Sequence, residues 1–115
     1  MEPFEYRREA TVERILEAAR PARSEVSDAR SAGAQFIAGG TNMTDYMALG
    51  VARPHVVVDV NALREGFSAI QADQHRLRLG ALVRMSEAED HSVIRNDYPV
   101  IAQTLTSAAS RQIRN

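Results

Sequence analysis

The chain has 115 residues, enough for one compact domain with a small core, and its hydrophobic content of 44% argues against disorder. Its 14 basic and 15 acidic residues leave a net charge of −1 and form no basic patch, so neither a nucleic-acid partner nor a membrane partner is expected. Cysteine is absent, which excludes disulfides, thiolate catalysis and cysteine-ligated metal clusters within these residues.

The first predicted elements are a short extended segment and a one-sided helix. Phe4 and Tyr6 alternate with charged residues, which is typical of extended backbone. Thr11 is expected to cap a helix that ends before Pro21. The apolar residues that recur along this helix are Val12, Ile15, Leu16 and Ala19. Residues 22–33 are polar and fit either a short helical turn or a loop.

The central stretch of the chain predicts a strand, a tight loop and a helix. Residues 35–38 form an apolar run that enters Gly39 and Gly40. Thr41, Asn42 and Thr44 are then available as caps for a helix. The apolar residues of that helix are Met43, Tyr46, Met47 and Leu49, and we interpret the first three as core.

This glycine loop is a candidate anion site. A strand that enters two glycines before a helix exposes several N–H groups with no Cβ beside them, which favours an anion such as diphosphate. The alternative is a plain turn, which the same spacing also permits. The loop lacks the G-x-G-x-x-G pattern and the G-K-[ST] ending, so a Rossmann dinucleotide site and a P-loop are both disfavoured.

The next segments extend the fold. Residues 55–60 are a β-branched run typical of a buried strand, which we place parallel to residues 35–38 in a βαβ unit with the glycine loop at the carboxyl end of its first strand. Residues 61–66 should turn the chain, and residues 67–82 predict a hairpin. Ser86 and Glu89 match a capping box, and Pro99 opens a last helix. The inner face of that helix is expected to carry Ile101, Leu105 and either Ala108 or Ala109.

The titratable side chains give no catalytic constellation. Asp45, Asp59 and Glu89 are interpreted as cap or solvated carboxylates. The three histidines have no partner four residues away, so a metal site is not expected. Arg111 and Arg114 fit either contacts with cofactor phosphates or charges at a helix C-terminus, and we favour the second interpretation.

Five segments together resemble a known family. They are Phe4-x-Tyr6, Phe36-Ile37-Ala38-Gly39-Gly40-Thr41-Asn42, Val58-Asp59-Val60-Asn61, Leu79-Gly80-Ala81 and Ala109-Ser110-Arg111-Gln112-Ile113-Arg114-Asn115. In this order they resemble the FAD-binding subunit of molybdenum hydroxylases, the family of xanthine dehydrogenase, carbon monoxide dehydrogenase and aldehyde oxidoreductase. The Thr-Asn after the double glycine is most similar to the aldehyde-oxidoreductase branch.

The resemblance implies a fold and a cofactor. The fold is expected to be α/β (α+β), a small βαβ-containing subdomain like the first FAD-binding subdomain of the vanillyl-alcohol-oxidase type. The cofactor-binding residues that the resemblance implies are Gln35, Phe36, Ile37, Ala38, Gly39, Gly40, Thr41, Asn42, Met43 and, near the flavin ring, Ala108. The N–H groups of residues 39–42 would contact the diphosphate. No residue of this chain is expected to be catalytic, because the flavin supplies the redox chemistry.

The resemblance also implies partners. A molybdenum-cofactor subunit would oxidise the substrate, iron–sulfur clusters of another subunit would relay the electrons, and FAD would pass them to an external acceptor. The start of the chain has no apolar signal region, so we expect a cytoplasmic protein, or one exported only with a partner that carries the signal.

The family pattern continues beyond the residues seen here. Family members carry a second glycine-rich loop and a further domain after the Arg-Asn pair, so residues 1–115 are expected to be an amino-terminal FAD-binding subdomain, truncated before that loop. Such a fragment should bind FAD weakly and self-associate through its uncovered apolar surface. The alternative function is a non-catalytic interaction or scaffold domain that keeps the fold without a cofactor.

Overall fold

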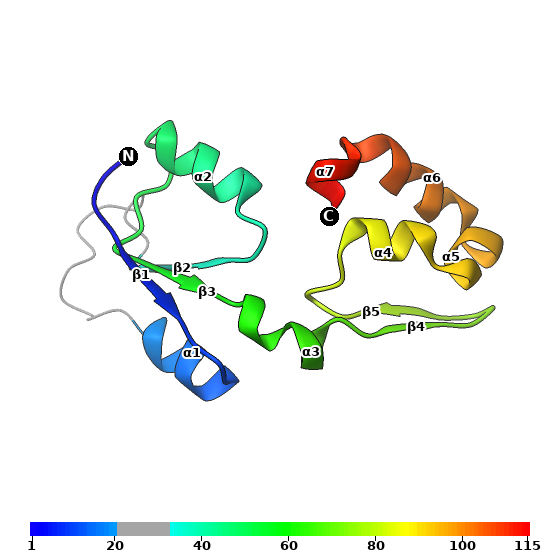
Figure 1. Ribbon diagram of the computed structural model, residues 1–115, viewed down its shortest axis with the longest axis horizontal. Helices are drawn as coiled ribbons and strands as arrows, with labels where there is room; N and C mark the ends of the chain where they lie inside the picture. The colour runs from blue at the N-terminus through cyan, green and yellow to red at the C-terminus, as the bar shows by residue number, and fades with distance from the viewer. Residues whose placement is uncertain (21–32) are drawn as a thin grey trace. The chain divides into compact units, whose positions relative to one another are not determined.

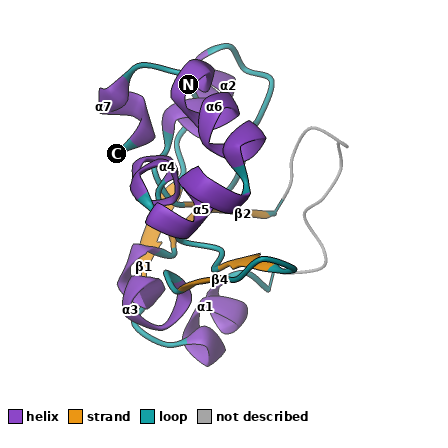
Figure 2. Cartoon of the chain, turned by 90° about the vertical axis from the view of Figure 1, so that its right-hand side faces the viewer, coloured by secondary structure: helices purple, strands orange, loops and turns teal. Residues whose placement is uncertain are grey.

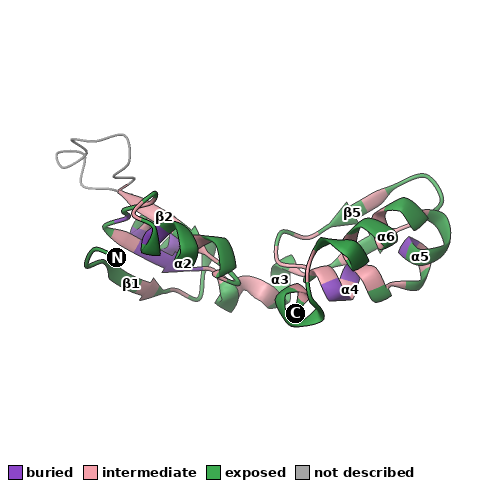
Figure 3. Cartoon of the chain, turned by 90° about the horizontal axis from the view of Figure 1, so that it is seen from above, coloured by how far each residue is buried: buried purple, intermediate pink, exposed green. Residues whose placement is uncertain are grey.

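The structure is a computed structural model that describes residues 1–20 and 33–115 (Figure 1). Its internal contacts divide the chain into two compact units, Met1–Leu63 and Arg64–Asn115, whereas the chain length predicted a single domain. Figure 3 shows that buried residues gather separately in the two parts. The choice between a short helical turn and a loop for residues 22–33 concerns residues outside the described part of the chain, apart from Gly33.

The first unit contains a three-stranded parallel sheet in the order β1-β3-β2. Its strands are β1 (Glu5–Arg8), β2 (Ala34–Ile37) and β3 (Val56–Asp59). Arg8 of β1 and Ile37 of β2 both lie opposite Asp59, so the carboxyl ends of all three strands meet at one edge. The parallel pairing of β2 with β3 confirms the prediction for those two segments. The extended backbone predicted around Phe4 and Tyr6 is β1, whose pairing with β3 was not predicted.

Two helices lie on opposite sides of this sheet, α1 (Val12–Ala18) and α2 (Thr41–Ala48) (Figure 1). The predicted cap of α1 is confirmed, because Thr11 Oγ1 accepts a hydrogen bond of 3.3 Å from the Arg14 N–H. The inner face of α1 consists of Ile15 and Ala18, which pack against Val58. The prediction that Leu16 belongs to this face is wrong, since Leu16 is 55% exposed.

The second unit begins after a short 3₁₀ turn, η1 (Asn61–Leu63), with the helix α3 (Arg64–Phe67). The predicted hairpin is confirmed as the antiparallel pair β4 (Ile70–Ala72) and β5 (Leu77–Leu79). Four helices follow: α4 (Met85–Asp90), α5 (Ser92–Asp97), α6 (Pro99–Ala108) and α7 (Arg111–Arg114). Figures 1 and 2 show α4 and α5 on one side of the hairpin.

The helix starts in the second unit agree only in part with the prediction. The short helix predicted at Ser86 is confirmed as α4, which begins at Met85. The predicted capping box from Ser86 to Glu89 is wrong, because the Arg84 N–H donates to Glu87 Oε2 at 2.9 Å and Ser86 is buried. Pro99 opens α6 as predicted, because a proline needs no helical N–H partner there. Ile101, Leu105 and Ala109 are half-buried and Ala108 is exposed, so Ala109 is the inward-facing alanine of the two alternatives.

Gly80 has a structural role in the hairpin. A Cβ at this position would lie 2.2 Å from the backbone oxygen of Phe67, closer than any side chain can approach. The two chain segments approach because the Gly80 N–H donates to Ala69 O at 2.9 Å and the Leu82 N–H donates to Phe67 O at 2.9 Å. Only glycine permits this backbone contact without a shift of one segment.

Candidate functional site

The glycine loop lies at the carboxyl edge of the parallel sheet, as the sequence predicted. β2 ends at Ile37, and α2 begins at Thr41 after Gly40, whose φ of +82° is a left-handed value that favours glycine. The two glycines differ in their surroundings. A Cβ on Gly40 would lie 3.2 Å from Ile37 Cδ1, whereas a Cβ on Gly39 would meet nothing within 4 Å. The open side of the loop is therefore at Gly39.

The first turn of α2 presents its N–H groups without a side-chain cap. Gly40 occupies the N-cap position, so the prediction that Thr41, Asn42 or Thr44 caps this helix is wrong. The Thr44 hydroxyl donates instead, to Gly40 O at 2.9 Å and Thr41 O at 3.2 Å. The first turn also contains no acidic residue. Uncapped N–H groups and the positive end of the helix dipole together make this turn suitable for an anion.

Asp59 lies at the same edge of the sheet and is one of the few buried polar residues among those described, with 6% of its surface exposed. Its Oδ2 accepts a 2.5 Å hydrogen bond from the Tyr6 hydroxyl and lies 3.8 Å from Arg8 Nε. Its Oδ1 accepts from the backbone N–H and the side-chain amide of Asn61, both at 2.7 Å. Of the two interpretations of Asp59, as a cap or as a solvated carboxylate, the solvated one is therefore wrong, and Oδ1 accepts from the N–H of the first residue of η1.

These contacts determine the ionisation of Asp59. Burial by itself raises the pKa of this carboxyl, but the hydrogen bonds from Tyr6 and Asn61, with a smaller contribution from the charge of Arg8, together bring the pKa below its usual value. The same hydrogen bond raises the pKa of the Tyr6 hydroxyl. Asp59 is thus an ionised carboxylate at neutral pH whose lone pairs are occupied by neighbouring donors.

Asn61 connects this carboxylate to the glycine loop. Its Nδ2 donates to Ala38 O at 2.9 Å in addition to Asp59 Oδ1. In the sequence, Asn61 was predicted only as the start of a turn and as part of a family motif. A polar residue directly after a buried strand, at the sheet edge that holds the loop, was the signal that could have identified it.

Most of the other predicted site residues lie on β2 or on α2. Gln35 and Ile37 are half-buried in β2, Phe36 is 51% exposed, and Ala38 is exposed. On α2, Met43 is half-buried. The expectation that the apolar residues of α2 are core holds for Met47, which is 4% exposed, and fails for Tyr46, which is 49% exposed. Ala108 belongs to the second unit, at the end of α6, and its approach to a flavin stays a prediction.

Arg114 stabilises the C-terminal end of α6. Its guanidinium donates to Thr106 O at 2.8 Å and also to Ala109 O. Its Nε lies 2.8 Å from Glu89 Oε2, where it forms an ion pair although the N–H is not aligned as a hydrogen bond. These contacts agree with the helix C-terminal interpretation of Arg114. They also show that Glu89, with 19% of its side chain exposed, is not a solvated carboxylate.

Arg111 is in a different position. Its side chain is 73% exposed, and its Nη2 lies 3.7 Å from Asp90 Oδ2. An ion pair this exposed contributes little to stability.

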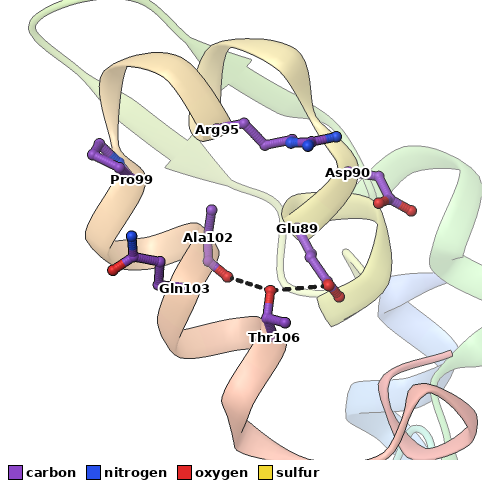
Figure 4. Close-up of a pocket in the computed structure, with 7 residues that line it drawn as sticks. All are labelled: Glu89, Asp90, Arg95, Pro99, Ala102, Gln103 and Thr106. Carbon is purple, nitrogen blue, oxygen red and sulfur yellow. Dashed lines mark hydrogen bonds between the residues drawn. The ribbon is translucent and has the colours of Figure 1, made fainter.

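A pocket of about 420 Å³ lies in the second unit between α4, α5 and α6 (Figure 4). Its lining consists of Glu89, Asp90, Arg95, Pro99, Ala102, Gln103 and Thr106. The Thr106 hydroxyl is shared between Glu89 Oε1 at 3.0 Å and Ala102 O at 2.9 Å. With two carboxylates and one guanidinium, the lining does not suit a diphosphate. Within residues 1–20 and 33–115, no three His, Asp or Glu side chains are grouped as a metal site.

A parallel sheet whose carboxyl edge carries a glycine loop and an uncapped helix start defines an α/β unit suited to a phosphate-bearing ligand. A family model described as the FAD binding domain in molybdopterin dehydrogenase matches residues 2–115. The chain therefore belongs to the family of FAD-binding domains of molybdopterin dehydrogenases, as the sequence motifs indicated.

Two curated relatives are similar in sequence. The chain is 44% identical over 96 residues to the aldehyde oxidoreductase FAD-binding subunit PaoB of Escherichia coli, a match that covers 83% of this chain and 30% of that subunit. It is 30% identical over 80 residues to the nicotinate dehydrogenase FAD-subunit of Eubacterium barkeri, covering 70% of this chain and 27% of that subunit. The chain thus spans about a third or less of the length of these relatives.

Solved structures show the same fold. Carbon monoxide dehydrogenase of Hydrogenophaga pseudoflava matches with a TM-score of 0.78 and 22% identity, over 99% of this chain and 37% of that chain. Quinoline 2-oxidoreductase of Pseudomonas putida 86 matches with a TM-score of 0.76 and 23% identity, over 99% of this chain and 36% of that chain. The mixed helix and strand fold predicted from the sequence is confirmed. In the part of the chain that the structure describes, no helix has the length and apolar character that a membrane span requires.

Proposed function

We propose that the glycine loop holds the diphosphate of FAD, with the N–H groups of residues 39–42 as donors. The observation that carries this proposal is the uncapped start of α2 beside Gly39, where a Cβ would meet nothing within 4 Å, in a chain of a FAD-binding family. The remaining cofactor contacts are proposed for residues 35–38, for Met43 and, near the flavin ring, for Ala108.

The residues of the loop fit this cofactor. A diphosphate needs several donors and no nearby unpaired carboxylate, and α2 supplies N–H groups with no acidic residue in its first turn. The carboxylate of Asp59 is compatible with an anion nearby, because Tyr6, Asn61 and Arg8 already surround it. When bound, FAD supplies the capacity to accept and release electrons singly or in pairs. The role of this chain is to bind and orient the cofactor.

The full-length gene product is proposed to be the FAD subunit of a molybdenum-containing hydroxylase of the aldehyde oxidoreductase type. Relatives are named as subunits, which supports a multi-subunit assembly. The proposed partners are one subunit with the molybdenum cofactor and one with iron–sulfur clusters, from which electrons reach an external acceptor through this subunit. We place the complex in the cytoplasm, or outside it when a partner carries the export signal.

The test is to purify the full-length gene product with its partner subunits and to measure flavin absorbance and FAD content after acid release. Stoichiometric FAD, reduced on addition of an aldehyde, is the expected result. A folded complex without flavin that also fails to take up added FAD would contradict the proposal and support the non-catalytic scaffold alternative.

The 115-residue chain by itself is proposed to be the amino-terminal part of the FAD-binding unit, to bind FAD weakly and to self-associate. Tyr46, Leu49 and Val51, at and just after the end of α2, are 49%, 76% and 61% exposed, so this part of the chain presents apolar side chains through which copies could associate. Titration of the purified chain with FAD, followed by flavin fluorescence alongside light scattering, tests both statements. Tight binding by a stable monomer would contradict them.

A further inference from the structure

The carbonyl groups at the end of β2 are held by the segment that follows β3. Ile37 O accepts from the Val60 N–H at 3.0 Å, and Ala38 O accepts from Asn61 Nδ2 at 2.9 Å. The second of these bonds is made by a side chain from a distant part of the sequence. The conformation of the chain at Ala38, directly before the glycines, therefore depends on how Asn61 is oriented.

The orientation of Asn61 is set by Asp59. The Asn61 amide nitrogen donates to Asp59 Oδ1 at 2.7 Å and to Ala38 O at 2.9 Å, so both of its N–H bonds are used. If the Asn61 amide were reversed, its oxygen would face Asp59 Oδ1 and Ala38 O, which are both acceptors. That orientation of the amide is therefore excluded. Asp59 is fixed in turn by the Asn61 backbone N–H at 2.7 Å and the Tyr6 hydroxyl at 2.5 Å. We call the hydrogen-bonded set of Tyr6, Asp59 and Asn61 the loop latch.

The loop latch acts on the peptide between Ala38 and Gly39. This peptide is trans, so its C=O and N–H point in opposite directions. Because Asn61 holds the Ala38 C=O, the Gly39 N–H must point away from Asn61, and none of the described residues is seen to accept a hydrogen bond from it. We infer that Asp59 and Asn61 are positioning residues that hold the Gly39 N–H toward the FAD diphosphate, an inference that rests on the proposed function of the loop.

Without the latch, the Ala38–Gly39 peptide would be free to rotate, since glycine imposes little restriction on its own dihedral angles. Binding would then have to order the peptide, and affinity would fall without loss of the fold. The residues of the latch contact the loop and not the ligand, so their effect is on the orientation of a donor. This separates their role from that of residues 39–42.

The experiment compares Asn61→Ala with the wild-type full-length gene product. Asn96→Ala is the matched control, because Asn96 is exposed on α5 and belongs to the second unit. The dissociation constant for FAD of Asn61→Ala should rise about tenfold, the equivalent of one hydrogen bond to an oriented group. Hydrogen–deuterium exchange over residues 36–43 should show less protection on FAD addition than in the wild type. The thermal midpoint of the apo protein should fall only slightly below that of Asn96→Ala, because two hydrogen bonds of the Asn61 side chain are lost while the fold is kept.

A second variant, Tyr6→Phe, removes only the hydroxyl from a residue that is 56% exposed, and it should raise the dissociation constant by about threefold with the fold intact. Unchanged FAD affinity and unchanged hydrogen–deuterium exchange in Asn61→Ala would contradict the positioning role inferred for the loop latch. So would a loss of FAD affinity in Asn61→Ala with FAD-dependent protection of residues 36–43 equal to that of the wild type, since the loss would then arise elsewhere. A wild-type protein that takes up no FAD would instead overturn the proposed function, so the two failures are distinguishable.

Discussion

Substitution of Gly39 by valine is the most direct test of the anion site. A Cβ at Gly39 meets nothing within 4 Å, and the residue has no left-handed φ, so the β-carbon of a valine can be added here without a clash. The same side chain would occupy the open side of the loop, where we place the diphosphate oxygens. The substitution therefore separates ligand binding from folding.

The expected magnitude follows from the donors that would be lost. Hydrogen bonds to charged groups contribute about 1.5 kcal/mol each, so loss of two N–H contacts would cost about 3 kcal/mol, or a rise in the dissociation constant for FAD on the order of 100-fold. The free energy of unfolding of the apo protein should change by less than about 0.5 kcal/mol, as for other exposed substitutions.

The assay is titration of the apo full-length gene product with FAD, followed by flavin fluorescence, together with urea unfolding of the same preparations. Gly66→Ala is the control, because a Cβ at Gly66 also meets nothing within 4 Å but lies in the second unit. Gly40→Val is a poorer test, since its Cβ would be directed at the Ile37 and Thr44 side chains and its φ is left-handed. If Gly39→Val binds FAD within about threefold of the wild type, the loop is a plain turn and the site is elsewhere.

Three other substitutions test the fold and its ionisation. Gly80→Ala should destabilise the second unit by about 3 kcal/mol, because its Cβ would lie 2.2 Å from Phe67 O; urea unfolding that matches Gly66→Ala would contradict this. Thr11→Ala should cost about 1 kcal/mol through loss of the cap of α1, and Thr104→Ala, at an exposed residue inside α6, should cost clearly less in the same assay. The native pKa of Asp59 is lowered, so its contribution to stability is present above the ordinary value of 3.8 and is lost as the pH falls through the lower native value. The stability difference between wild type and Asp59→Asn should shrink over that range, and a constant difference would show that Asp59 does not titrate as argued.

The sequence by itself determined the elements whose signals are local. The β-branched run that became β3, the paired glycines before α2 and Pro99 at the start of α6 are each encoded by neighbouring residues, because strand propensity, turn geometry and helix entry act within a few positions. The family motifs likewise identified the FAD-binding family, which the match over residues 2–115 confirms. The position of the candidate site followed from the same signals, since parallel strands bring their carboxyl ends to one edge.

Only the tertiary structure decided which polar side chains are held at that edge. From the sequence, Asp59 is interpreted as a cap or solvated carboxylate. It is buried because β1 pairs with β3 and brings Tyr6 to it from 53 residues away. Asn61 reads as a turn residue, and its contact with Ala38 spans 23 residues. A hydrogen bond between two distant segments cannot be recognised from the sequence of either segment, because each segment supplies only the donor or only the acceptor. The hydrogen bonds that orient the glycine loop could therefore be seen only once the three strands lay side by side.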